Sequence, residues 1–286
     1  MKSVITDTGR IVFEGVKNFS PSLTFDCGQC FRFDVLADGS AVGTVGREHA
    51  KISVSGDVLT IDGGKDTEFW RGYLGLDEDY DAIKKDIGEH FGKYGDVIFD
   101  AMRVGGGIHI LRQDMWEALC SFIVSQNNNI GRIKKIIARL CEKYGEPFDS
   151  DGETYYTFPT AQALAGASVS DIFSCGTGFR AKYISDAAKR VASGETDLEY
   201  ISSLSDEKAV EELTKICGVG PKVANCTLLF GFYRLASFPI DVWIRRVLDK
   251  YYKNGIDLGD LGSYAGVAQQ YLFYYERYKQ NGEDGK

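Results

Sequence analysis

Residues 213–224, LTKICGVGPKVA, constrain the fold more than any other stretch of the chain. Apolar residues recur at helical spacing up to Ile216, which indicates a helix that ends near this point. Gly218 can adopt the left-handed conformation that ends a helix, and Pro221 suits the first position of the next one. The segment therefore predicts two helices joined by a tight Gly-Val-Gly turn, over about residues 205–231.

The start of the second helix combines an anion-binding turn with a lysine. The backbone N–H groups of Gly218 and Gly220 lie at the open end of the helix, where they attract a phosphate. Lys222 falls in the first turn, where the helix dipole and a partly dry site both favour the neutral amine. The pattern predicts a nucleophilic lysine, and an ordinary surface lysine at a helix start is the alternative.

Composition limits the class of protein only loosely. With 286 residues, the chain is long enough for two or three compact units. We find neither a secretory signal after the first Met nor an apolar run that could span a bilayer. We therefore expect an intracellular protein without a membrane partner, cytoplasmic at the nucleoid in a prokaryote or nuclear in a eukaryote. The seven cysteines are scattered, which does not predict a disulfide scaffold.

The formal charge of -8 argues at first sight against a nucleic-acid partner. The charge is unevenly distributed, since residues 1–100 hold 11 basic and 18 acidic residues, and the rest of the chain holds 22 and 23. Residues 103–145 contain seven basic residues against three acidic ones. A basic segment on an acidic protein is compatible with DNA binding that is weak without a specific site and strongly dependent on salt.

The order of apolar patterns predicts a sheet followed by helices. Three segments alternate apolar and polar residues between turn signals, at 42–45, 50–54 and 58–61. Beyond residue 100 the pattern is mostly helical, and residues 145–160 break it with Gly, Pro and Asp, which predicts a loop. We expect an α+β, mainly α fold, with an antiparallel sheet domain and flanking helices over 1–100 and a helical part over 101–286.

Several motifs together resemble a known family. LTKICGVGPKVA followed by Pro239-Ile240-Asp241 resembles the helix-hairpin-helix, Gly/Pro-Asp superfamily of DNA base-excision glycosylases. GQCFRF, SQNNNIGR, CGTGFRAKYI and YAGVAQQYLF extend the likeness over nearly the whole chain, toward the 8-oxoguanine DNA glycosylases. The resemblance implies two helical subdomains beside the sheet domain, with a DNA-binding cleft between them.

The resemblance implies that Lys222 and Asp241 carry the chemistry. Lys222 would attack the sugar and form a Schiff base, and Asp241 would stabilise the positive charge that develops there. Asp241 is also well placed to cap the helix that follows, which alone could explain it. The implied enzyme is bifunctional: it excises 8-oxoguanine and then cleaves the strand by β-elimination.

No cofactor and no catalytic metal are implied. The chain has no cysteine after Cys226, which excludes the C-terminal iron–sulfur loop of some relatives. Cys27 and Cys30 form one CxxC pair without a second pair at zinc-finger spacing. The resemblance adds a structural cation on the hairpin, at the carbonyls of Thr214, Ile216 and Val219.

A pocket for the flipped base is implied by four positions. The Gly28 carbonyl would accept the N7–H that 8-oxoguanine has and guanine lacks, so that the undamaged base leaves a costly unmatched acceptor pair. Gln269 would bind the Watson–Crick edge, and Cys226 and Phe273 would stack on the two faces of the base. The alternatives are an ordinary turn before a strand at Gly28 and simple packing for the C-terminal helix.

Further positions are implied to contact the opposite base and the DNA backbone. Asn127 would fill the space left by the flipped base, Arg132 and Arg180 would contact the opposite base, and Phe179 would wedge into the stack. The alternative for the last two is a buried Phe179 and a solvated Arg180. Backbone contacts are implied for three residues: Gly218, Gly220 and Trp243.

The implied partner is double-stranded DNA that contains 8-oxoguanine, bound by a monomer. Two alternatives stay open. A monofunctional glycosylase for another damaged base has no use for a lysine at position 222, because water is its nucleophile. A non-catalytic helix-hairpin-helix module needs the Gly-Val-Gly turn but neither Lys222, Asp241 nor a base pocket.

Overall fold

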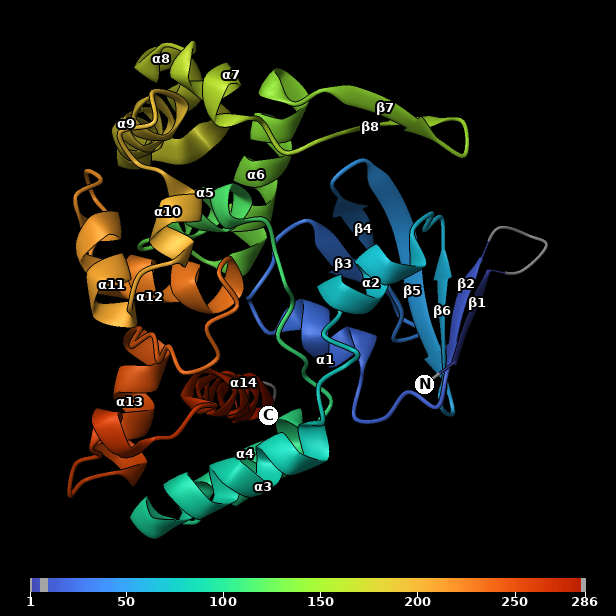
Figure 1. Ribbon diagram of the computed structural model, residues 1–286, viewed down its shortest axis with the longest axis vertical. Coiled ribbons are helices and arrows are strands. Elements are labelled where there is room, and N and C mark those ends of the chain that lie inside the picture. Colours follow the sequence, from blue (N-terminus) through green and yellow to red (C-terminus); the bar gives the residue numbers. More distant parts are fainter. Residues whose placement is uncertain (1, 6–9, 284–286) are drawn as a thin grey trace.

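The N-terminal part of the computed structural model contains a six-stranded antiparallel sheet in the order β1-β2-β6-β5-β4-β3 (Figure 1). Its strands are β1 (Lys2–Ile5), β2 (Ile11–Glu14), β3 (Phe33–Val35), β4 (Ala41–Val45), β5 (Glu48–Ser55) and β6 (Val58–Asp62). The predicted antiparallel sheet is confirmed, and the three predicted segments are β4, β5 and β6. The structure describes residues 2–5 and 10–283, so residues 1, 6–9 and 284–286 of the predicted ranges 1–100 and 101–286 lie outside it.

One face of the sheet is apolar and buried. The antiparallel register places Ile11 opposite Ile61 and Phe13 opposite Leu59, so that these side chains share a face. Helices α1 (Pro21–Asp26) and α2 (Thr67–Tyr73) contribute aromatic residues to the same core, among them the fully buried Trp70. The N-terminal part therefore has a hydrophobic core of its own.

The rest of the chain is mainly helical, which confirms the predicted α+β, mainly α class. The helices that follow α2 are α3 (Tyr80–Phe91), α4 (Val97–Gly105), α5 (Met115–Ser125), α6 (Ile130–Tyr144), α7 (Ala161–Ala165), α8 (Val169–Ile172), α9 (Ala181–Ala192), α10 (Leu198–Ser202), α11 (Asp206–Thr214), α12 (Pro221–Phe230), α13 (Val242–Tyr251) and α14 (Ala265–Glu283). Short irregular helical turns are η1 (Gly92–Tyr94), η2 (Phe173–Thr177), η3 (Gly178–Arg180) and η4 (Leu258–Asp260).

Helix α14 runs through the helical body and joins its parts (Figure 1). It packs against α4, where a side chain on Gly105 would lie 3.2 Å from the ring of Tyr271. The predicted boundary after residue 100 therefore falls inside a helix that packs into the helical body. Among the described helices, none combines the length and the apolar character needed to cross a membrane.

The helix-hairpin-helix is present as the sequence predicts. Helices α11 and α12 flank the Gly-Val-Gly turn, with Pro221 at the first position of α12. Gly218 has a φ of 78°, and a Cβ there would lie 2.4 Å from the ring of Tyr183. Only glycine therefore fits this turn, because both the backbone conformation and the packing exclude a side chain.

The predicted loop over 145–160 is wrong, since it contains a β-hairpin formed by β7 (Pro147–Ser150) and β8 (Glu153–Tyr156). The hairpin leaves the helical body and reaches toward the sheet (Figure 1). The ring of Tyr155 stacks on His49 at 3.7 Å, and Arg47 pairs with Glu146 at 2.7 Å. These contacts with the sheet stabilise a two-stranded hairpin that would be marginal alone.

Candidate active site

A cavity of about 820 Å³ opens where α5, α12, α13 and α14 meet. Its wall brings together residues from across the chain, and the predicted ones among them are Gly28, Asn127, Gly220, Lys222, Cys226, Asp241, Trp243, Gln269 and Phe273. The other predicted site residues, Arg132, Phe179, Arg180 and Gly218, do not line it. The two predicted catalytic residues and the four predicted base-pocket residues thus share one cavity.

The amine of Lys222 is held at the cavity wall by α5. Its Nζ donates to the Ser125 Oγ at 3.1 Å, and that hydroxyl donates in turn to the Phe122 carbonyl at 2.8 Å. The Nζ also lies 5.4 Å from the centre of the Phe122 ring. One hydrogen bond and one aromatic face therefore position a lysine that forms no ion pair with a described residue.

Asp241 has two distinct carboxylate oxygens. Oδ1 caps α13 by accepting the N–H groups of Trp243 at 3.0 Å and Ile244 at 2.8 Å, which confirms the predicted cap. Oδ2 accepts no hydrogen bond from any described residue. Burial raises the pKa of this carboxyl, while the Ile244 N–H and the charge of Lys222 oppose the increase. The cap thus leaves one oxygen of a partly desolvated carboxylate available to the cavity.

Gly28 lies close to two side chains of the cavity wall. Its φ is 76°, and a Cβ there would lie 3.2 Å from the Ile130 Cδ1 and 3.6 Å from the Phe273 ring. Its carbonyl accepts no hydrogen bond from a described residue. The expected turn before a strand is also present, since β3 begins at Phe33. The backbone of Gly28 therefore lies beside the predicted stacking ring with a free acceptor.

Cys226 forms part of the cavity wall one helical turn beyond Lys222. Burial raises the pKa of its thiol to about 11, against a smaller opposing effect of the Lys222 charge. The thiol is therefore neutral near pH 7 and offers a polarizable surface.

The three consecutive asparagines have different environments. Asn129 caps α6 by accepting the Arg132 N–H at 2.9 Å, and Asn128 donates to the Val124 carbonyl at 3.1 Å. Asn127 is exposed, has a φ of 47°, and its side chain bonds to no described residue. The structure thus distinguishes the first asparagine as the one free to meet a ligand.

Arg180 does not project into solvent, although it is predicted to contact the opposite base. It is 3% exposed, and its guanidinium donates to the Gln126 carbonyl at 2.7 Å, Asn127 at 3.0 Å and Thr177 at 3.1 Å. In this structure the side chain holds the turn that carries Asn127. The alternative of a buried Phe179 and a solvated Arg180 is wrong for both residues, because Phe179 is 49% exposed.

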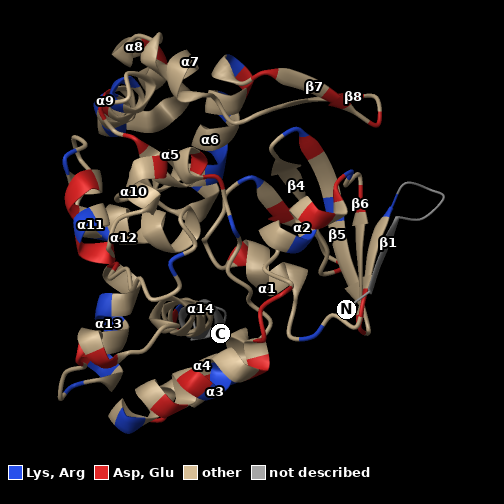
Figure 2. Ribbon diagram, viewed as in Figure 1, with Lys and Arg blue, Asp and Glu red and all other residues tan. Residues whose placement is uncertain are grey.

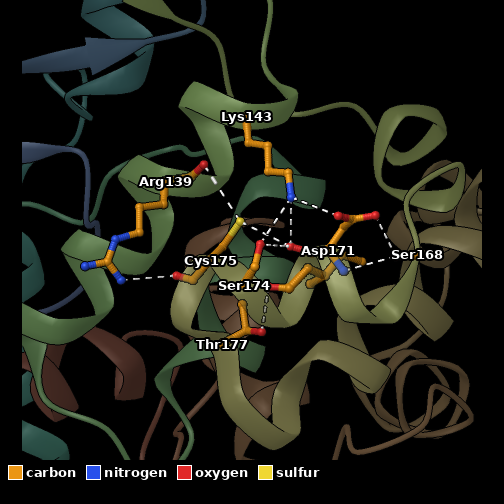
Figure 3. Close-up of polar contacts among 8 residues, drawn as sticks. Arg139, Lys143, Ser168, Asp171, Ser174, Cys175 and Thr177 are labelled. Atoms are coloured by element: carbon orange, nitrogen blue, oxygen red, sulfur yellow. Dashed lines mark hydrogen bonds and ion pairs between the residues drawn. The ribbon is translucent and has the colours of Figure 1, made fainter.

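The α8–η2 segment, which directly precedes the turn with Phe179, is fastened to α6 (Figure 3). Lys143 donates to the Asp171 carbonyl at 3.2 Å and to the Ser174 hydroxyl at 3.1 Å. Arg139 donates to the Cys175 carbonyl at 3.4 Å. The exposed Phe179 ring and the asparagine turn are consequently carried by one connected unit.

Basic residues gather on α6 and α13, which border the cavity (Figure 2). Not all of them are free, since Lys134 pairs with Asp34 at 2.9 Å and Lys143 with Asp171 at 3.2 Å. Arg132 is exposed, and its guanidinium pairs with no described residue. The positive charge available to a polyanion is therefore smaller than the sequence suggests.

The predicted backbone-binding region is refined by three observations. The Val219 N–H donates to the Ile216 carbonyl at 3.0 Å, so in the hairpin turn only the N–H groups of Gly218 and Gly220 are available to an anion. The Trp243 ring lies 6.4 Å from the Phe273 ring, and the Arg246 guanidinium lies 5.0 Å from the Trp243 ring. The indole of Trp243 is uncharged, so Arg246 supplies a positive charge beside this predicted contact with the DNA backbone. The cation at the hairpin carbonyls stays a prediction.

Several residues of the cavity wall were not predicted, namely Phe31, Phe122, Ser125, Arg245 and Gln270. Ser125 begins the polar run before α6, and Gln270 directly follows Gln269, so both adjoin predicted positions. The two phenylalanines look like ordinary core residues in the sequence, and only the fold shows that their rings border a cavity.

Two family models match consecutive parts of the chain. The family model described as HhH-GPD superfamily base excision DNA repair protein matches residues 120–256, and the one for the 8-oxoguanine DNA glycosylase N-terminal domain matches residues 11–119. The structure of MBOgg1 in complex with a low-affinity DNA ligand has a TM-score of 0.90 at 39% identity, covering 98% of this chain and 100% of that one.

A second solved structure is similar over the same length. It is the Clostridium acetobutylicum 8-oxoguanine glycosylase/lyase in complex with double-stranded DNA containing cytosine opposite 8-oxoG, with a TM-score of 0.89, 36% identity and coverage of 98% and 99%. The probable N-glycosylase/DNA lyase of Methanothermobacter thermautotrophicus is 33% identical over 195 residues, 58% of this chain and 62% of its own length. The chain thus spans less than two thirds of this curated relative.

A helix-hairpin-helix beside a cavity that holds a lysine and a partly buried aspartate defines a base-excision DNA repair protein of the HhH-GPD superfamily. The likeness over the full chain, including the N-terminal sheet domain, narrows the class further. The chain belongs to the 8-oxoguanine DNA glycosylase family.

Proposed function

We propose that this protein is a bifunctional DNA repair glycosylase that excises 8-oxoguanine from duplex DNA and then cleaves the strand. The observation that carries the proposal is the meeting of Lys222 and Asp241 in one cavity with Gly28, Gln269 and Phe273. A nucleophile, a carboxylate and a set of base-facing groups are the parts that base excision requires. The C. acetobutylicum complex favours cytosine as the opposite base.

The cavity contains groups that would recognise the flipped base before it is excised. A flipped base between Cys226 and Phe273 would be stacked on both faces, with the Gln269 carboxamide at its Watson–Crick edge. The free Gly28 carbonyl would accept the N7–H of 8-oxoguanine, whereas the N7 lone pair of guanine would face that carbonyl without a proton between them. Selection of the damaged base then depends on one backbone acceptor.

Excision follows from the position of the lysine. The unprotonated amine of Lys222 attacks C1′ as the bond from C1′ to N9 breaks, and the electron pair leaves with the base, which takes up a proton. The carboxylate of Asp241 stabilises the positive charge on the sugar during this step. Opening of the sugar ring gives the Schiff base. Loss of a C2′ proton then breaks the bond to the 3′ oxygen and cleaves the strand.

The opposite strand and the backbone would be held by residues around the cavity. Asn127 would enter the space left by the base, Phe179 would wedge into the stack, and Arg132 would meet the opposite cytosine. Gly218 and Gly220 would bind a phosphate at the start of α12. We propose that one monomer does this, in the nucleoid or the nucleus.

The experiment that tests the proposal is a borohydride trap. The protein is mixed with a duplex that contains one 8-oxoguanine opposite cytosine, or with an undamaged duplex, and released base and cleaved strand are measured separately. We expect a covalent complex, free base and a nicked strand on the damaged duplex alone. Free base without a nick would favour the monofunctional alternative, and binding of both duplexes without turnover would favour the non-catalytic one.

We expect Gly28→Ala to reduce excision of 8-oxoguanine by at least about tenfold, because a strained backbone moves the carbonyl of residue 28 away from the N7–H, and loss of one well-placed hydrogen bond in a dry pocket has this size. The added methyl is strained at a φ of 76° and crowds the Ile130 side chain and the Phe273 ring. Single-turnover base release measures the effect. Gly152→Ala, at an exposed hairpin position with a φ of 81° and nothing near its Cβ, is the matched control for backbone strain. Equal excision by both variants would contradict a role for Gly28.

We expect Arg180→Met to lower the free energy of unfolding by about 2–4 kcal/mol, because one buried and two partly buried carbonyls lose their donors. Denaturant unfolding measures this. Arg132→Met, at an exposed position on α6, is the control and should change stability by less than about 0.5 kcal/mol. Similar stability of the two variants would show that Arg180 does not hold the asparagine turn.

A further inference from the structure

Two adjacent glutamines on α14 line the cavity, and the proposed function uses only one of them. Gln269 and Gln270 are each 3% exposed. The Gln270 Nε2 donates to the Gln269 Oε1 at 3.2 Å. The side chain of Gln270 makes no other hydrogen bond with a described residue. Its one polar contact is thus the residue at the Watson–Crick edge of the proposed base site.

Packing does not explain an amide at position 270. The Gln270 Oε1 is sealed from solvent and accepts no hydrogen bond from the described residues. A buried acceptor without a partner is destabilising, and leucine would fill a similar volume without that cost. Only the amino group of the Gln270 side chain forms a hydrogen bond, and its oxygen forms none. Such a buried side chain beside a proposed ligand site calls for a functional explanation.

The contact between the two glutamines decides which end of the Gln269 carboxamide meets the base. A free carboxamide can turn over and present either its oxygen or its amino group. Because Gln270 donates to the Gln269 Oε1, the Gln269 Nε2 is left toward the cavity, where it bonds to no described residue. This amino group matches the O6 acceptor of a guanine edge, and the second lone pair of Oε1 matches N1–H.

We propose that Gln270 is a positioning residue that fixes the orientation of Gln269 and thereby the reading of a guanine-type edge. The inference rests on the proposed function, since it concerns the same base site. Gln270 acts through Gln269 and does not itself take part in bond breaking. Its effect must therefore disappear when Gln269 can no longer form hydrogen bonds.

A double-mutant cycle tests this directly. Single-turnover release of 8-oxoguanine is measured for the parent protein, Gln269→Leu, Gln270→Leu and the double variant. We expect Gln270→Leu to reduce release about tenfold in the parent, and less than about twofold when Gln269 is already leucine. Melting temperatures are recorded for all four proteins, and Gln162→Leu, on the exposed face of α7, is the control for the substitution.

Two outcomes would overturn the inference. An equal loss in both backgrounds would show that Gln270 acts through the fold and not through Gln269. No loss in the parent background would show that Gln269 needs no positioning. Gln270→Met repeats the cycle with a flexible side chain of similar length, so that poor packing of leucine cannot produce either result.

Cleavage of a duplex with an abasic site separates this inference from the proposed function. Such a duplex has no base to read, so strand cleavage on it depends on Lys222 without base recognition. We expect Gln270→Leu to lower the ratio of base release to abasic cleavage. A parent protein that cleaves neither duplex would contradict the proposed function, and the inference with it. A parent protein that acts on both, with an unchanged ratio in Gln270→Leu, would overturn the inference alone.

Discussion

Lys222→Gln is expected to abolish the borohydride-trapped complex and to slow base release by at least about 10³-fold, as removal of a nucleophile does in other enzymes. Glutamine is one atom shorter than lysine, whose Nζ contacts the Ser125 hydroxyl at 3.1 Å, but it keeps a polar side chain at this half-buried position. The variant should therefore fold and bind the damaged duplex. The result would assign the covalent step to this amine.

The matched control for Lys222→Gln is Lys215→Gln. Lys215 lies in the same helix-hairpin-helix, directly before the turn, but it pairs with Glu212 at 2.6 Å and does not line the cavity. Its replacement should leave trapping and base release within about twofold, since surface pairs contribute little. If Lys222→Gln still forms a trapped complex, another amine is the nucleophile and the mechanism proposed here is wrong.

Asp241→Asn is expected to reduce base release by about 10²-fold or more, which is the usual effect of losing one electrostatic group that stabilises a transition state. Asparagine caps helices about as well as aspartate, so α13 should keep its N-terminal hydrogen bonds. Asp241→Ala should lose the same activity and, in addition, about 0.5–2 kcal/mol of stability. The two variants thus separate the cap from the catalytic charge.

The pH dependence gives a second measurement on Asp241. Burial raises its pKa, so the carboxylate that stabilises the sugar cation is lost at a higher pH than an ordinary aspartate would show. We expect the acid limb of the rate profile to lie correspondingly high and to be absent in Asp241→Asn. The same limb in both proteins would assign it to another group.

The raised pKa of Asp241 also determines how this carboxyl affects the free energy of unfolding at different pH values. A folded-state pKa above the unfolded one favours the folded state at low pH, and this contribution is lost as pH rises through the folded value. At neutral pH the parent therefore bears the cost of a partly buried carboxylate. Asp241→Asn should be at least as stable as the parent at pH 7, with no such advantage in acid.

Much of the site could be predicted because its chemistry depends on local patterns. The Gly-Val-Gly turn, the proline that opens α12 and the lysine after it are short-range features, and the structure places them as expected. The cap by Asp241 is equally local, since it involves the next three residues. The sheet class follows from alternation of apolar residues over single strands.

Other features depend on contacts between distant segments. Strand β3 has only three residues and pairs with β4, so its own sequence carries little signal. The β7–β8 hairpin is stabilised by Tyr155 on His49, residues about a hundred positions apart in the chain. Gly, Pro and Asp in this segment indicate that the helical pattern is interrupted. They cannot show that the sheet lies close enough to pair with the hairpin.

Arg180 shows the same limit within the site. An arginine in a glycine-rich segment is predicted to face solvent or a ligand, because its charge is costly to bury. Three carbonyls of the Gln126–Asn127 turn and the η2 segment satisfy its guanidinium, and they come together only when α5 and α9 pack. Arg180 is buried because these carbonyls accept its hydrogen bonds, and no local sequence pattern reveals that they lie nearby.

The sequence by itself determined the helix-hairpin-helix, the cap at Asp241 and the antiparallel sheet, and it pointed to Lys222 and Asp241 as the proposed nucleophile and charge stabiliser. The turn and the cap depend on hydrogen bonds and backbone conformations within a few residues, and the sheet was recognised from the alternation of apolar residues along single strands. Only the tertiary structure decided that Gly28, Lys222 and Gln269 share one cavity, that Ser125 holds the lysine and that Gln270 is buried beside them. Such contacts join segments up to about 240 residues apart, and side-chain packing of the whole helical body fixes them.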